Sequence, residues 1–391
     1  MFELEIRNHL ETGIIPFWKT LRDDTYGGYY GWLGYDLALD KKAEKGCILN
    51  SRITWFFSSA YLTLGDKSLL DEARHGYEFL KNFCIDQKYG GIFWSLNYDG
   101  TPKDTTKHTY NQAFAIYALS AYYEAAREKE ALDLAKELFE LIEEKCTDSE
   151  GYLEAFTREF LPESNEKLSE NGVMATRTMN TLLHVLEAYT QLYKVSKDER
   201  VREKLIRIID IFEKKVYNPV LQRQEVFFDE SYHSIIDLYS YGHDIETAWL
   251  MDLTLDVIDD AKLTERISKI TRAMTQRVYE VAFDGRSLAN ECERGKVNEH
   301  RVWWIQAENI VGLINGYEKN PQKVEYLEAA KAQWEFIKDY VIDKRAGSEW
   351  YWEVSKEGVP YEGRPIVEPW KCPYHNGRMC MEVIKRMKGA D

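Results

Sequence analysis

The chain has 391 residues, of which 44% are hydrophobic and 30% are charged, as in ordinary globular proteins. Its formal net charge of −15 disfavours nucleic acids and anionic membranes as partners, because their phosphates are bound mainly by Lys and Arg. The first residues lack the apolar stretch of a signal peptide, no apolar run could span a membrane, and the six cysteines form no C-x-x-C pair. We therefore expect free thiols in a reducing compartment, and a single domain over residues 1–391.

Long stretches of the chain carry apolar residues at helical spacing, and no Pro/Ser-rich linker interrupts them. This periodicity predicts a mostly helical, all-α protein. In chain order, the expected helices cover 53–64, 113–126, 131–144, 179–193, 201–212, 246–258, 304–317 and 326–340.

Short segments rich in glycine and aromatic residues lie between these helices and indicate turns or small β-hairpins. Six of them recur roughly every 60 to 75 residues, the length of one helical hairpin plus a loop. A hairpin that cannot bury its apolar face alone must stack on its neighbours. Six such units can close into a ring, and an open solenoid is the alternative. The segments are 26–30, 89–94, 150–152, 226–229, 283–285 and 347–351.

A second series of polar and aromatic residues follows the turns, at the points where helices are expected to begin. In a closed ring, one helix of each hairpin lines the inside, so that equivalent helix ends meet at one mouth. This arrangement would bring together residues that are far apart in the sequence, namely Arg52, Tyr110, Asn180, His184, His243, Trp304 and His375.

The helix openings also place polar groups on shared helix faces. Asn180 and His184 are four residues apart, and Trp304 and Glu308 have the same spacing. A polar contact at a helix end explains any single pair, but six polar openings in one register favour a functional site. The histidines of three different openings suit acid–base chemistry, because a neutral imidazole can exchange a proton near pH 7. The histidines at 9, 75, 233 and 300 have charged or amphipathic surroundings and are expected at the surface.

A metal site is an alternative for part of this set. His243 and Glu246 are three residues apart and resemble two metal ligands, with His184 or Glu308 as a third. The chain has no compact H-x-x-x-H motif and no Cys/His cluster. It also lacks a G-x-S-x-G elbow, a P-loop and a G-x-G-x-x-G motif. We therefore expect neither a metal nor another cofactor.

Five longer stretches are specific enough to compare with known families. They are PWKCPYHNGR at 369–378, SYGHDIE at 240–246, RVWWIQAE at 301–308, KHTYN at 107–111 and the opening 16–31. Together they resemble the cellobiose 2-epimerases of the N-acylglucosamine 2-epimerase superfamily, over essentially the whole chain. The resemblance implies an (α/α)₆ barrel with short β-hairpin insertions at its mouth and a cytoplasmic enzyme that uses neither metal nor nucleotide.

The resemblance also implies roles for individual residues. His243 and His375 match two opposed acid–base histidines, and His184 matches a third that moves a hydroxyl proton during ring opening. Carboxylates that orient these histidines or bind hydroxyl groups are expected at Glu246 and Glu308. The residues expected to hold the sugar are Arg52, Tyr110 and Asn180, with Trp304 and Trp370 as stacking platforms.

The activity implied is inversion of carbon 2 in the reducing-end glucose of cellobiose, lactose and related β-1,4-linked disaccharides. An N-acylglucosamine 2-epimerase and a mannose-type aldose–ketose isomerase are alternatives within the superfamily. An inverting glycoside hydrolase would need two carboxyl groups about 6.5 to 9.5 Å apart, for which Glu246 and Glu308 are candidates. A non-catalytic sugar-binding protein would not need three histidines. We expect a disaccharide as the partner, and a monomer or weak dimer.

Overall fold

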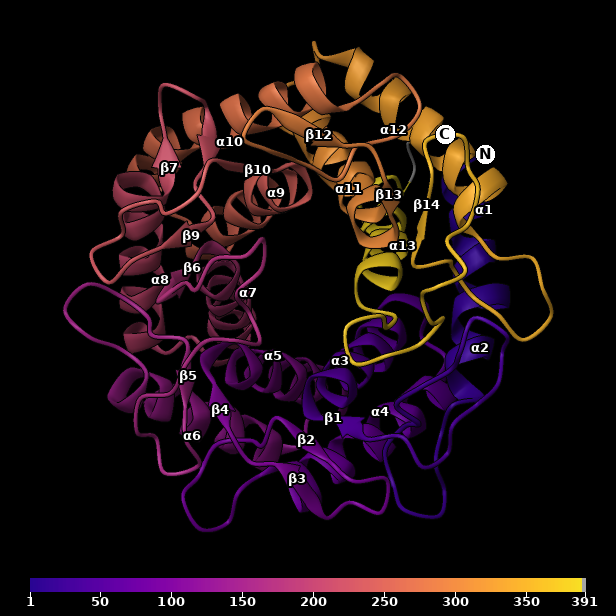
Figure 1. Ribbon diagram of the computed structural model, residues 1–391, viewed down its shortest axis with the longest axis vertical. Coiled ribbons are helices and arrows are strands. Elements are labelled where there is room, and N and C mark those ends of the chain that lie inside the picture. Colours follow the sequence, from indigo (N-terminus) through magenta and orange to yellow (C-terminus); the bar gives the residue numbers. More distant parts are fainter. Residues whose placement is uncertain (389–391) are drawn as a thin grey trace.

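The computed structural model describes residues 1–388 and arranges their helices in two concentric rings (Figure 1). Each of the six inner helices in this part of the chain packs against the next, and the last packs against the first. The ring is therefore closed, which confirms the (α/α)₆ barrel and excludes an open solenoid. The inner helices are α3 (Cys47–Leu64), α5 (Thr109–Ala126), α7 (Met179–Ser196), α9 (Tyr241–Ile258), α11 (Trp303–Lys319) and α13 (His375–Arg386).

The outer helices cover the inner ring, and several of them continue into a turn of π-helix (η). Each packs on the inner helix that precedes it in the chain, while the N-terminal helix packs on α13. All eight helices expected from the periodicity are observed, whereas those at 2–19, 67–84 and 261–282 were not predicted. The outer helices are α1 (Phe2–His9) with η1 (Leu10–Ile14) and α2 (Ile15–Lys19), α4 (Lys67–Phe79) with η2 (Leu80–Cys84), α6 (Lys129–Lys145), α8 (Glu199–Ile211) with η3 (Phe212–Val216), α10 (Ala261–Ala282), and α12 (Val324–Phe336) with η4 (Ile337–Val341).

Inner and outer helices differ in how much of their surface is buried. Every residue of α5 from Thr109 to Tyr122 is buried, whereas α8 buries one apolar face that includes Val201, Leu205 and Ile208. A helix enclosed on all sides needs no polar face, and a helix at the surface does. None of the described helices is long and apolar enough to cross a membrane, and all six cysteines are free thiols.

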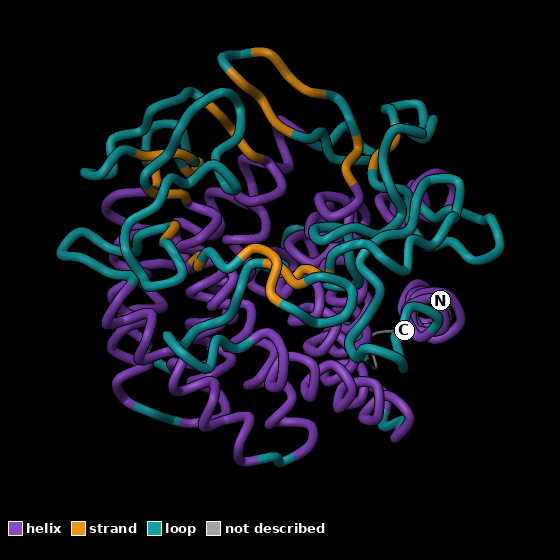
Figure 2. Tube along the Cα trace, turned by 60° about the horizontal axis from the view of Figure 1, so that its bottom comes forward, coloured by secondary structure: helices purple, strands orange, loops and turns teal. Residues whose placement is uncertain are grey.

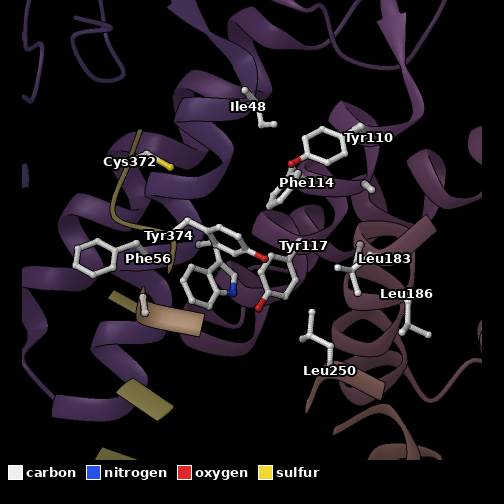
Figure 3. Close-up of a cluster of buried hydrophobic side chains, with 14 of the residues drawn as sticks. Ile48, Phe56, Tyr110, Phe114, Tyr117, Leu183, Leu186, Leu250, Cys372 and Tyr374 are labelled. Carbon is white, nitrogen blue, oxygen red and sulfur yellow. The ribbon is translucent and has the colours of Figure 1, made fainter. Parts of the chain in front are cut away.

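Aromatic side chains fill the middle of the barrel. Trp55 stacks on Tyr117 with ring centroids 5.2 Å apart, and Tyr374 meets Trp55 edge-on at 5.4 Å. Figure 3 shows Phe114, Tyr117 and Tyr374 converging from α5 and from the segment that precedes α13. These rings give the helix ends above them a rigid base, because a packed core deforms little.

Short antiparallel strands join the helices at one end of the barrel (Figure 2). They form two three-stranded sheets, β1 (Lys45–Gly46) with β2 (Ser95–Leu96) and β3 (Pro102–Asp104), and β10 (Leu238–Ser240) with β11 (Glu291–Glu293) and β12 (Lys296–Asn298). The two-stranded pairs are β4 (Lys107–His108) with β5 (Ala155–Phe156), β6 (Arg177–Thr178) with β9 (Phe227–Phe228), β7 (Tyr217–Asn218) with β8 (Arg223–Gln224), and β13 (Arg301–Val302) with β14 (Glu353–Val354). The hairpin insertions expected at the mouth are thus observed.

An ion pair with a buried cation recurs just before most of the inner helices, and its acid is buried as well in three of the five pairs. The Nζ of Lys45 lies 2.6 Å from Asp23, in the Gly/aromatic turn of the same repeat, and both side chains are inaccessible to solvent. A buried pair fixes one arrangement of the chain, because separating its charges leaves one of them without a partner. The equivalent pairs are Lys107–Asp86 (3.2 Å), Arg177–Asp148 (2.5 Å), Arg301–Asp284 (2.8 Å) and Lys371–Glu349 (2.6 Å). Tyr239 occupies the cation's position in the fourth repeat.

Candidate active site

The recurring cation gives all six repeats a common register at the mouth of the barrel. In each repeat, the seventh residue after the cation position belongs to an inner helix. It lies one helical turn beyond the third residue after that position. We call the six residues at the seventh position the charged layer: Arg52, Phe114, His184, Glu246, Glu308 and Arg378. The third position holds Ile48, Tyr110, Asn180, Gly242, Trp304 and Tyr374, and His243 and His375 share the fourth. Most residues predicted for the site therefore come from equivalent places in the repeat.

His375 lies at the start of α13 and is bound by a carboxylate of α11. Its Nδ1 is 2.8 Å from Oε1 of Glu308, and Oε1 of Glu246 is 3.8 Å away. Trp249 donates its indole N–H to the other oxygen of Glu308 at 2.9 Å. Burial, together with the nearby charges of Arg378 and Arg52, lowers the pKa of His375 well below its usual value. His375 is therefore neutral at pH 7, with Nε2 as the nitrogen that does not face Glu308.

His184 has a carboxylate partner on its own helix. Its Nδ1 lies 3.0 Å from Oε2 of Glu187, one turn further along α7, and both side chains are buried. Tyr110 contacts the imidazole edge-on, with ring centroids 5.0 Å apart. Burial lowers the pKa of His184, although the hydrogen bond to Glu187 opposes this shift. Burial alone would raise the pKa of Glu187, but the charge of Arg378 and the hydrogen bond with His184 lower it to about 2.

His243 differs from the other two histidines because its partner is a hydroxyl group. Its Nδ1 lies 2.7 Å from Oγ of Ser240, the residue that caps α9. Burial, with a smaller contribution from His184, lowers the pKa of His243 to about 3. The Trp304 indole contacts both His243 and His375, at centroid distances of 4.7 and 5.3 Å. The two histidines therefore border the same aromatic ring, although 132 positions separate them in the chain (375 − 243).

Arg52 on α3 binds groups of both neighbouring repeats, at α5 and just before α13. One Nη donates to the Tyr110 hydroxyl at 2.8 Å and the other to the backbone carbonyl of Trp370 at 3.3 Å. The guanidinium lies over the ring of Phe114, 4.2 Å from its centroid. The Nε of Arg52 is buried without a hydrogen-bond partner among the described residues. Arg52 is thus held in place while one of its donors remains unused.

The remaining predicted residues lie nearer to solvent. Asn180 is half-buried, and its Oδ1 has no hydrogen-bond partner among the described residues. Trp304 and Trp370 are half-buried as well, whereas Arg52 and Tyr110 are buried. The Trp370 ring meets Tyr110 at a centroid distance of 5.9 Å. The structure thus brings all ten predicted residues to one end of the barrel.

Comparison with known proteins identifies the family of the chain. Residues 27–375 match the model of the N-acylglucosamine 2-epimerase (GlcNAc 2-epimerase) family. The chain belongs to this family. It is 51% identical to the cellobiose 2-epimerase of Ruminococcus albus, with 98% of each chain covered. Among solved structures, a sugar epimerase from a ruminal bacterium has a TM-score of 0.98 at 51% identity over 100% of both chains, and the cellobiose 2-epimerase of Bacillus thermoamylovorans has a TM-score of 0.94 at 46% identity over 98% and 99%.

Two residues of this family member join the site although the sequence analysis did not single them out. Glu187 binds His184, and Arg378 donates hydrogen bonds to Glu187, Glu246 and Glu308. The register of the buried cations could have identified Arg378, because it is the seventh residue after Lys371. Glu187 gives no such signal, because a glutamate three residues after a histidine is common on helix surfaces.

The short distances between the carboxyl groups of the site help to judge two alternatives, a metal centre and an inverting hydrolase. Atoms of Glu246, Glu308 and His375 lie within 4.8 Å of one another, so this group could hold a cation, but His243 is not part of it. Nη2 of Arg378 already bonds the Oε1 atoms of both glutamates and supplies the positive charge there. Oxygens this close are also nearer than the separation of about 6.5 to 9.5 Å that an inverting hydrolase needs for its water.

Proposed function

We propose that this epimerase inverts carbon 2 of the reducing-end glucose of cellobiose, giving 4-O-β-glucosyl-mannose, and converts lactose to epilactose in the same way. The observation that carries the proposal is the set of three neutral imidazoles around one mouth, two buried and one (His243) half-buried, each with its own hydrogen-bond partner. Cellobiose 2-epimerases that are about half identical to the chain over nearly its whole length support the choice of substrate.

The first step is ring opening, because the proton on carbon 2 is not acidic in the closed pyranose. A base takes the proton of the anomeric hydroxyl group, the bond from carbon 1 to the ring oxygen breaks, and an acid protonates that oxygen. Carbon 1 becomes an aldehyde, which acidifies the proton on carbon 2. We assign the hydroxyl proton to His184, whose Nδ1 is occupied by ionised Glu187. A neutral imidazole fixed in this way can act as the base.

The second step removes the proton from carbon 2 and leaves a cis-enediolate. Negative charge develops on the oxygen of carbon 1, and fixed donors stabilise such charge because they need not reorient. Arg52, Tyr110 and His184 are suited to this role, since the hydrogen bond between Arg52 and Tyr110 and the ring contact between Tyr110 and His184 hold them together.

The third step returns a proton to the opposite face of carbon 2. Rotation about the bond between carbons 2 and 3 presents that face, and a second histidine protonates it. We assign abstraction and return to His243 and His375, whose roles exchange when the reaction runs backwards. Their shared contact with Trp304 supports the assignment, because a sugar beside this indole is within reach of both imidazoles.

The second sugar of a disaccharide needs a surface outside the reacting centre. We assign it to Trp370, which is half-buried and lies near Trp94 at a centroid distance of 5.8 Å. An indole face binds the C–H face of a pyranose, while the sugar hydroxyls find polar partners. We also assign the protein to the cytoplasm, which is consistent with its six free thiols.

Incubation of the purified protein with cellobiose, mannose and N-acetylglucosamine, followed by separation of the products, tests the proposal. We expect 4-O-β-glucosyl-mannose from cellobiose, with much slower or no conversion of the other two sugars. Conversion of N-acetylglucosamine alone would contradict the substrate assignment. Free glucose from cellobiose would point to hydrolysis instead.

A further inference from the structure

Arg378 is a buried cation of the charged layer that binds groups from several helices. One Nη donates to Glu187 on α7 and to the Tyr374 hydroxyl, and the other donates to Glu246 on α9 and to Glu308 on α11, the last at 2.8 Å. The guanidinium lies between two rings, 4.3 Å from the centroid of Tyr374 and 4.8 Å from that of Trp249. Its side chain is 2% exposed. With both Nη atoms bound to protein groups, Arg378 has no terminal donor left for a sugar.

The carboxylates that Arg378 binds are also the partners of two histidines. Glu187 binds Nδ1 of His184, and Glu308 binds Nδ1 of His375. One guanidinium thus connects the two imidazole–carboxylate pairs across the barrel, from α7 through α13 to α11. A planar guanidinium with donors on both sides can do this, whereas the ammonium group of Lys acts as a point charge.

We propose that Arg378 is a positioning residue of the reaction, which holds Glu187 and Glu308 as carboxylates so that His184 and His375 both keep their proton on Nδ1 and present a bare Nε2. The inference rests on the proposed function, because it assigns the bare Nε2 atoms to proton transfer. Arg378 itself touches neither the substrate nor a reacting atom.

Without Arg378, the protons of the buried carboxyl groups and histidines would be distributed differently. Three buried carboxyl groups, those of Glu187, Glu246 and Glu308, would then have no cation between them. At least one more of them would be protonated than in the unaltered protein. Burial already raises the pKa of Glu308 and, together with the charge of Glu308, raises that of Glu246 well above its usual value. A protonated Glu308 would donate to Nδ1 of His375 instead of accepting from it. The proton of His375 would then move to Nε2, and the histidine would no longer be a base at that atom.

Histidine ¹⁵N spectra of the unaltered protein test the proposal without any substitution. The shifts of the two ring nitrogens show which one carries the proton, and spectra of His184→Asn and His375→Asn assign the signals. We expect Nδ1–H with a bare Nε2 for both residues at pH 7. A dominant Nε2–H form of either histidine would overturn the proposal, even if variants at position 378 fail to fold.

Arg378→Lys is the matching substitution, because one ammonium group cannot bind Glu187 and Glu308 at the same time and therefore leaves at least one of them without a cation. We expect kcat for cellobiose epimerisation to fall about 100-fold with KM changed less than threefold, because proton transfer is impaired and sugar contacts are not. The Nε2–H signal of His375 should rise at the same time. Unchanged kcat and an unchanged ¹⁵N spectrum in folded Arg378→Lys would refute the role.

Arg386→Lys is the control, because Arg386 lies on the same helix and binds Glu318 at 2.6 Å and Glu382 at 3.0 Å, away from the histidines. We expect its kcat to stay within about twofold of the unaltered protein. An equal loss in both variants would mean that Arg378 only stabilises α13. If the unaltered protein does not epimerise cellobiose but its histidines change tautomer in Arg378→Lys, the proposed function fails and the positioning role remains.

Discussion

Buried charges occur in two regions of the barrel and are balanced differently in each. At the turns, one cation faces an acid of the same repeat, as in Lys45–Asp23 and Lys371–Glu349, and the pairing recurs in five of the six repeats within residues 1–388. In the charged layer, Arg378 alone donates hydrogen bonds to three carboxyl groups, those of Glu187, Glu246 and Glu308. Two of these carboxyl groups also bind histidines.

The contrast separates the parts of the repeat that build the fold from the parts that carry chemistry. A pair that recurs in equivalent places fixes how a turn meets the next helix. The charged layer shows no such repetition, because its equivalent positions hold Arg, Phe, His and Glu. Substitutions at the turns should therefore change stability, and those at the mouth should change turnover.

The largest effect is expected from His375→Asn. Asparagine fills similar space but cannot accept a proton from carbon 2, so kcat for cellobiose should fall about 10³-fold or more. Calorimetric titration with cellobiose should show a Kd within about threefold of the unaltered protein, because the stacking surfaces remain. A variant that keeps more than a tenth of the original kcat would remove His375 from the proposed mechanism.

Lys45→Met tests whether the ion pairs at the turns stabilise the fold. Removal of the ammonium group leaves Asp23 buried without its partner, which should lower the free energy of unfolding by about 3–5 kcal/mol. The matched control is Lys103→Met, because Lys103 and Glu44 form an exposed pair at 2.6 Å that should contribute at most about 1 kcal/mol. Urea unfolding measures both. Equal losses in the two variants would show that burial of the pair does not matter.

The pH dependence of stability tests whether His243 is neutral in the folded protein. Its pKa falls from 6.5 to about 3 on folding, so between these values the unfolded chain binds more protons. The contribution of His243 to the free energy of unfolding is therefore present in full above pH 6.5. It is lost as the pH falls toward 3, by at most about 1.4 kcal/mol per pH unit. His9 and His108 shift in the same direction, to about 4.

In His243→Asn this contribution disappears, so urea unfolding between pH 4 and 6.5 should give a shallower dependence than in the unaltered protein. Identical slopes would show that His243 is charged or exposed in the folded state.

The smallest effect is expected from Ser240→Ala. A neutral hydroxyl is a weaker partner for an imidazole than a carboxylate, so its loss should reduce kcat only about fivefold. Glu308→Gln should reduce kcat much more, because the amide can donate to Nδ1 of His375 and thereby reverse its tautomer. Steady-state kinetics on cellobiose compare the two variants. Equal losses would contradict the distinction between the two kinds of partner.

The closed ring and the convergence of the ten candidate residues at one mouth could be predicted because both follow from the repeat and from specific motifs. The inner helices are apolar over most of their length, which made them easy to identify. Among the amphipathic outer helices, α6 and α8 were predicted, whereas α4 and α10 were not. His9 was expected at the surface, but its Nε2 accepts a hydrogen bond from the Trp350 indole at 2.8 Å. That contact joins residues 341 positions apart, and no local pattern reveals it. No local pattern reveals the pairing of Glu187 with Arg378 either.

The exchange of solvent deuterium during turnover tests the central claim most directly. In the proposed mechanism, one imidazole removes the proton from carbon 2 of the opened reducing-end sugar and another returns a proton to the other face. In D₂O, cellobiose should therefore be converted to its mannose-ended epimer with deuterium at carbon 2 and with the glycosidic bond intact, as NMR of the product would show. Release of glucose, or an epimer that keeps the original hydrogen at carbon 2 in full, would contradict it.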